Sequence, residues 1–68
     1  MVIAFKRDGL ITRDGVRVGM IERCHGSTGW RIRFYPEAGL SVSAKYSLTM
    51  KGGKEVARSY LSGAHHDH

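Results

Sequence analysis

Two Asp-Gly pairs, Asp8-Gly9 and Asp14-Gly15, most strongly limit the folds that this chain can adopt. Asp-Gly is typical of the two-residue turn of a β-hairpin, in which both central residues adopt a positive φ. Strand-like residues flank the pairs at 2–7, at 10–13 and from 16 onward. The pattern predicts three successive antiparallel strands, with one pair in a looser turn because the middle segment has only four residues. The alternative is that both pairs are surface turns without a hairpin.

Alternation of apolar and polar residues extends the predicted meander toward the C-terminus. Residues 30–35 form the clearest strand, with Trp30, Ile32 and Phe34 on one face and the intervening residues on the other. Residues 16–24 alternate at first, but the pattern then breaks, which indicates a bulge or bend near Gly19. Residues 40–46 form the last predicted strand. The face predicted to be buried carries Val18, Met20, Trp30, Ile32, Phe34, Val42, Ala44 and Tyr46.

The last predicted element has a helical period. Val56, Ala57, Tyr60 and Leu61 form one apolar stripe. Because glycine inside a helix costs about 1 kcal/mol relative to alanine, we expect the helix to begin near Gly53 and to end near 62–63. Such a short helix needs a surface to pack against. The sequence therefore predicts a small α+β domain over residues 1–63, with an antiparallel meander of three to five strands, one C-terminal helix packed on one face, and a disordered His-rich tail at 64–68.

Composition limits the function of a chain of 68 residues. Its 11 lysines and arginines against six acidic residues give a net charge of +5. The single cysteine, Cys24, excludes an internal disulfide, which fits a reducing cytoplasm. The apolar run after Met1 is too short for a signal peptide or a membrane span, so we expect no membrane partner. The serines and carboxylates form no catalytic motif, and Cys24 with His25 is not a zinc site. We expect no enzyme activity, no metal and no cofactor.

The other face of the predicted sheet is basic and without acidic residues. It carries Arg17, Arg23, Arg31, Arg33, Tyr35, Ser41, Ser43 and Lys45, although a bulge at Gly19 would move Arg23 to the opposite side. A guanidinium group can bind phosphate oxygens or a guanine edge through two hydrogen bonds, and a sheet can enter the major groove of DNA. These residues therefore predict a nucleic-acid-binding surface, most readily for double-stranded DNA. The alternative is that this face is simply solvated.

A stretch of the chain resembles a known DNA-binding family. The run Gly29-Trp30-Arg31-Ile32-Arg33-Phe34, followed by a turn, a strand, Ser47-Leu48-Thr49 and a helix with Glu55-Val56-Ala57, resembles the AP2-like domain, also found at the N-termini of phage integrases. The resemblance implies a three-stranded sheet plus one helix, with Arg31 and Arg33 reading DNA. Gly52-Gly53 departs from the family at the start of the helix. The chain is also similar to short phage and prophage proteins. This resemblance implies a phage-type regulator or recombination accessory protein in the cytoplasm of a bacterial host.

A second class of function uses the same basic face. The alternative to DNA binding is an interaction protein that binds a host or partner protein through this face. Small phage-encoded inhibitors of a host nuclease, defence complex or polymerase are of this kind. The apolar segment Val2–Phe5 would form an edge strand, which allows a homodimer. The tail His65-His66-Asp67-His68 is interpreted as a frayed terminus and not as a metal site.

Overall fold

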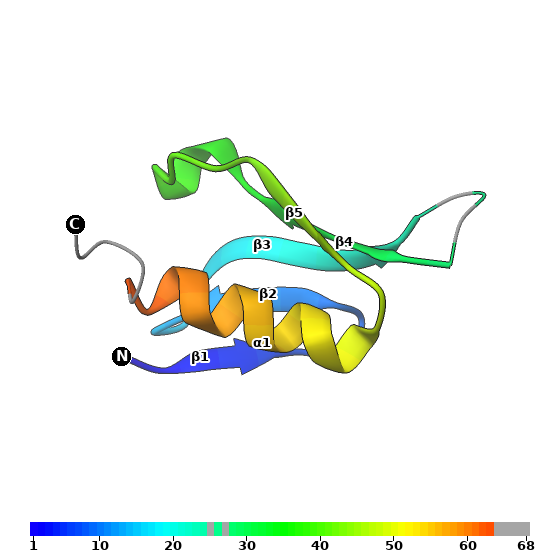
Figure 1. Cartoon of the computed structure of the whole chain (residues 1–68). Helices are drawn as coiled ribbons and strands as arrows, with labels where there is room; N and C mark the ends of the chain where they lie inside the picture. Colours follow the sequence, from blue (N-terminus) through cyan, green and yellow to red (C-terminus); the bar gives the residue numbers. More distant parts are fainter. Residues whose placement is uncertain (25, 27, 64–68) are drawn as a thin grey trace.

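A computed structural model describes residues 1–24, 26 and 28–63 of the chain. The fold is α+β: a five-stranded antiparallel sheet in the order β1-β2-β3-β4-β5, with one C-terminal helix on one face (Figure 1). The elements are β1 (Ile3–Phe5), β2 (Leu10–Arg13), β3 (Val16–Arg23), β4 (Trp30–Phe34), a 3₁₀ turn η1 (Pro36–Ala38), β5 (Ala44–Ser47) and α1 (Met50–Leu61). The predicted fold class is confirmed. The tail at 64–68 lies outside the described residues.

The two Asp-Gly pairs form the first two hairpins, as expected. Asp14 and Gly15 have φ of 54° and 84°, the paired positive values of a two-residue hairpin turn. At Asp8-Gly9 only the glycine has a positive φ, and the N–H of Gly9 donates to the carbonyl of Lys6. This is the looser of the two turns. Short turns thus connect β1, β2 and β3 into an antiparallel meander.

A β-bulge in β3 changes the face on which its later side chains lie. Ile11 of β2 is opposite Gly19, whereas Thr12 is opposite Arg17, so Val18 is an extra residue on β3. A Cβ at Gly19 would lie 2.4 Å from the carbonyl oxygen of Arg33 in β4, which explains why glycine stands there. The bulge anticipated near Gly19 is confirmed.

The side chains beyond the bulge alternate in the opposite sense to that predicted. Ile21 is buried beneath α1, while Met20 pairs with Arg33 on the other face and is only half-buried. The prediction that Met20 belongs to the core is wrong, because the extra residue in β3 shifts the alternation by one position.

The helix α1 begins earlier than predicted. Its N-cap is Thr49, whose hydroxyl oxygen accepts a hydrogen bond from the N–H of Gly52 at 2.9 Å. Gly52 and Gly53 therefore lie inside the first turns of the helix, and the expected start near Gly53 is wrong. Gly53 is buried where the helix approaches Ile32 closely, which explains why a residue without a side chain occupies a helical position.

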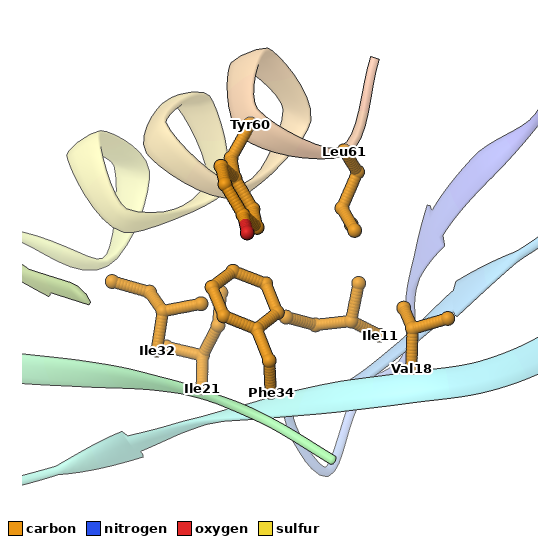
Figure 2. Packing of buried hydrophobic residues seen from close by; sticks show 8 residues of the cluster. Ile11, Val18, Ile21, Ile32, Phe34, Tyr60 and Leu61 are labelled. Atoms are coloured by element: carbon orange, nitrogen blue, oxygen red, sulfur yellow. The ribbon is translucent and has the colours of Figure 1, made fainter. Parts of the chain in front are cut away.

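The core lies between α1 and the sheet face that it covers. Figure 2 shows Tyr60 and Leu61 of the helix pointing toward the apolar side chains of the strands. The rings of Tyr60 and Phe34 lie 5.0 Å apart between centroids. The buried cluster consists of Ile11, Val18, Ile21, Ile32, Phe34, Ala57, Tyr60 and Leu61. Trp30 is half-buried at the margin of this cluster.

The last strand is shorter than predicted and faces the other way. Residues 40–43 are not part of β5; the Tyr60 hydroxyl holds them, accepting a hydrogen bond from the N–H of Val42 at 3.0 Å. In β5, Lys45 is opposite Ile32 and Tyr46 is opposite Arg31. Directly opposite residues share a face, so Lys45 lies on the helix side, whereas Ala44 and Tyr46 do not. The predicted burial of Tyr46 is wrong, because its side chain is 65% exposed.

Candidate nucleic-acid interface

The sheet face that α1 leaves uncovered, here called the open face, carries three arginines and two tyrosines. Cross-strand pairing places Arg31 beside both Glu22 and Tyr46, and Arg33 beside Met20. Arg17 pairs with Thr12 further along the sheet. The main side chains of the open face are Leu10, Thr12, Arg17, Met20, Glu22, Arg31, Arg33, Tyr35 and Tyr46.

Glu22 stands between the two arginines of β4. Its Oε2 accepts a hydrogen bond from Arg31 Nε at 2.8 Å and a longer one from Arg33 Nε at 3.4 Å. These hydrogen bonds lower the pKa of the Glu22 carboxyl below its usual range. The carboxylate fixes both guanidinium groups side by side and neutralises part of their charge.

The expectation that the open face has no acidic residue is therefore wrong. The bulge in β3 brings Glu22 onto this face. The predicted face followed uninterrupted alternation, although the bulge expected near Gly19 already implied this shift.

Four of the six predicted site residues lie together on the open face. Arg17, Arg31 and Arg33 project from it, and the Tyr35 ring lies 5.8 Å from the Arg33 guanidinium carbon, a cation–π distance. The three arginines reach the same face from two neighbouring strands, β3 and β4.

The predicted placement of Arg23 and Lys45 on this face is wrong. Arg23 pairs with Trp30 on the helix side, and its guanidinium carbon lies 4.9 Å from the indole ring. Lys45 Nζ lies 5.2 Å from the ring of Tyr60. The bulge in β3 moves Arg23, and the register of β5 against Ile32 moves Lys45. Ser41, also predicted on the basic face, instead hydrogen-bonds through its hydroxyl to the hydroxyl of Tyr60 at 3.3 Å.

Tyr46 is the site residue that the sequence argument missed. The alternation of residues 40–46 assigned it to the core, yet it is exposed beside Arg31. Leu48, just beyond β5, is 82% exposed. Tyr46 and Leu48, one aromatic and one aliphatic, are thus left in solvent at the end of β5. The sequence signal for an irregular strand end is Thr49, the helix N-cap, which follows Tyr46 and Leu48 closely.

A smaller basic group lies on the opposite side, where α1 packs over β1. Lys54 Nζ and the Arg58 guanidinium carbon lie 5.9 and 5.1 Å from the ring of Phe5. Both residues cover the apolar edge of the core with their side chains. Their positions suit a structural role in closing the core, since long basic side chains commonly shield apolar surface in this way.

Among the described residues, no group of three or more His, Cys, Asp and Glu side chains could hold a metal ion. Cys24 is a half-buried free thiol. Within the same part of the chain, no helix has the length and apolar character that crossing a membrane requires.

Comparison with known proteins gives no relative from which a function could be taken. No family model, curated protein or solved structure matches the chain.

Proposed function

We propose that this protein is a nucleic-acid-binding module that contacts its ligand through the open face. The observation that carries the proposal is the set of three arginines and two tyrosines on one uncovered sheet face, with Glu22 as the acidic residue among them. Both described ion pairs involve Glu22, so the other basic side chains have no acidic partner among the described residues. A net charge of +5 adds a long-range attraction for a polyanion.

The chemistry of these side chains fits phosphate and base contacts together. Arg31 and Arg33 are held in a fixed orientation by Glu22, so little side-chain freedom is lost when they bind phosphate oxygens. Tyr35 and Tyr46 offer ring faces and hydroxyl groups beside these cations. Arginine next to an aromatic ring is a combination that nucleic-acid-binding surfaces use for backbone contacts and base stacking.

A protein partner at the same face is the second candidate. Two observations favour it: Leu10 and Met20 are half-buried apolar residues of the open face, and Glu22 neutralises part of the charge beside them. Protein interfaces are enriched in methionine, tyrosine and arginine. Capture of partners from a bacterial lysate, with and without nuclease treatment, separates the two functions. A nuclease-resistant partner of fixed stoichiometry would support this second candidate and contradict the first.

The proposal is tested with variants that remove equal charge from different faces. Arg31→Ala with Arg33→Ala removes two cations from the open face, and Arg7→Ala with Lys51→Ala removes two exposed cations elsewhere. We expect the first pair to weaken binding to DNA at least tenfold, and the second pair to weaken it much less, because only the first makes direct contacts. Glu22→Gln keeps a side-chain oxygen that can accept hydrogen bonds from the two arginines but removes the negative charge, and should strengthen binding.

Circular dichroism establishes that each variant is folded before affinity is measured. If both double variants lose affinity equally, binding is non-specific attraction to a basic protein, and the open face is not the site. If no variant or parent binds any DNA or RNA at low salt, the nucleic-acid function is wrong.

A further inference from the structure

We infer that the protein binds an unpaired nucleotide, and hence single-stranded nucleic acid, at the end of the sheet around Tyr46. The inference rests on the proposed function and specifies its ligand. The base would stack on Tyr46 in an apolar hollow, while the attached phosphate would be held by Arg23 and Arg31 in a neighbouring one. The base would thus be bound at the end of the open face. The ligand would be single-stranded, whereas the sequence predicted double-stranded DNA.

Two hollows meet at the place where β3 ends, β4 begins and β5 ends. The first, of about 380 Å³, is lined mainly by apolar surface, including Trp30, Tyr46 and Leu48. The second, of about 260 Å³, is lined by Arg23, Cys24, Arg31 and Tyr46. Cys24 and Tyr46 line both hollows, so an apolar site and a cationic site share one wall. In Figure 1 the end of β3 and the start of β4 project beyond the start of α1, so the helix does not extend over this part of the sheet.

Two large side chains at this place lie outside the core. Tyr46 is 65% exposed and Leu48 is 82% exposed, and neither belongs to the buried cluster. Large apolar side chains left together in solvent, next to a cationic site, commonly mark a binding surface. The first hollow is within the range of about 300–1,000 Å³ that small-molecule sites occupy.

Charge and shape together favour a nucleotide as the occupant. An aromatic ring beside guanidinium groups can bind a flat base and its phosphate at the same time. An aliphatic ligand would contact only the apolar hollow, and a simple anion would contact only the arginines. Glu22 accepts a hydrogen bond from Arg31 and neutralises part of its charge. Arg23 lies over the Trp30 ring and has no acidic partner among the described residues. The cationic hollow therefore keeps a net positive charge.

Stacking on Tyr46 requires a base whose face is free. In a duplex both faces of every internal base are covered by neighbouring bases, so a protein can reach them only after unstacking. A single strand offers free base faces at no such cost. The geometry therefore distinguishes single-stranded nucleic acid from a duplex, which would contact only the arginines of the open face.

The intrinsic fluorescence of Trp30 provides the test, because it is the only tryptophan of the chain and lines the apolar hollow. The full chain is titrated with a thymidine oligonucleotide and with a duplex of the same length, and affinities are also measured by anisotropy of labelled DNA. We expect the single strand to change the Trp30 emission and to bind at least tenfold more tightly than the duplex.

Two variants of Tyr46 and one of Arg23 locate the ligand. Tyr46→Ala removes the stacking ring and should weaken single-strand binding at least tenfold, whereas Tyr46→Phe keeps the ring and should bind like the parent. Both variants should remain folded, because Tyr46 is exposed. Arg23→Ala should flatten the dependence of log affinity on log salt by about one unit.

The outcomes separate this inference from the function on which it rests. If single strand and duplex bind equally, or if Tyr46→Ala binds like the parent, the nucleotide site is wrong while the nucleic-acid function stands. If Arg23→Ala has the same salt dependence as the parent, no phosphate is bound in the second hollow, and the nucleotide site is wrong. If neither form of DNA nor an RNA strand binds at low salt, the proposed function itself fails.

Discussion

The bulge in β3 decides which side chains form the open face, and Gly19→Ala tests it directly. A Cβ at Gly19 would lie 2.4 Å from the carbonyl oxygen of Arg33 and 3.2 Å from the Cα of Phe34. Both atoms belong to the backbone of β4, so no side-chain rotation can relieve the contact. The two central strands would have to separate, or the bulge would have to move.

The expected loss of stability is large for a domain of this size. Overpacking in a well-packed region costs roughly 1–3 kcal/mol, and we expect the upper end, about 3 kcal/mol, because backbone atoms are involved. A domain of this length loses about 4–8 °C in Tm for each kcal/mol. Gly19→Ala should therefore melt about 12–24 °C below the parent, as followed by circular dichroism.

Gly53→Ala is the matched control, since it adds the same methyl group at a second buried glycine. A Cβ there would lie 3.5 Å from Ile32 Cδ1, an ordinary van der Waals contact, and the position is helical. Alanine is favoured over glycine in a helix by about 0.8–1.0 kcal/mol, so this variant should melt slightly above the parent. The bulge geometry would be refuted if Gly19→Ala melted like the parent, or if both variants lost stability equally.

Two other predictions concern side-chain hydrogen bonds. Tyr60→Phe removes the hydroxyl that accepts a hydrogen bond from the N–H of Val42, and should lower the free energy of unfolding in urea by about 1 kcal/mol. Tyr46→Phe is the control, and should lower it by no measurable amount because that ring is exposed. Equal losses in the two variants would contradict this role of Tyr60. The pKa of Glu22 is lowered from its ordinary value of 4.5 by hydrogen bonds from Arg31 and Arg33. Its ionised form therefore stabilises the fold above the unfolded pKa, and that contribution is lost as the pH falls through the lower folded pKa. In urea titrations at decreasing pH below 4.5, the parent should lose more stability than Glu22→Gln; parallel losses would show that the ion pair is absent in solution.

The sequence was sufficient for the order of the elements and for the two faces of β4. The Asp-Gly pairs fixed the first turns, because positive φ at Asp14 and Gly15 is a local requirement that those residue types meet. Trp30–Phe34 alternates without interruption, so Ile32 and Phe34 were correctly placed in the core and Arg31 and Arg33 on the open face. The helical stripe of Ala57, Tyr60 and Leu61 was also predicted, although the capping by Thr49 was not.

The side of the sheet on which Glu22, Arg23 and Lys45 lie could not be predicted with the same certainty. A bulge changes the face of every later residue on its strand, and its position depends on how closely Gly19 approaches β4. For β5, the alternation of residues 40–46 continues through a segment that the Tyr60 hydroxyl holds outside the sheet. Contacts between distant parts of the chain set both registers. The sequence indicated a bulge near Gly19 but not which residue is the extra one, and it gave no sign of the irregular segment before β5. Glu22 between the two arginines is the main consequence for the site.

The most direct test of the central claim is to locate the bound nucleic acid on the surface by NMR. ¹H–¹⁵N spectra of the full chain, recorded during titration with a single-stranded and a duplex oligonucleotide, report on the backbone amides and on the arginine Nε–H groups. The account predicts that the largest shifts fall on Arg17, Arg31, Arg33, Tyr35 and Tyr46, with α1 little affected. Shifts concentrated on Lys51, Lys54 and Arg58 of α1, with the open face unchanged, would contradict it.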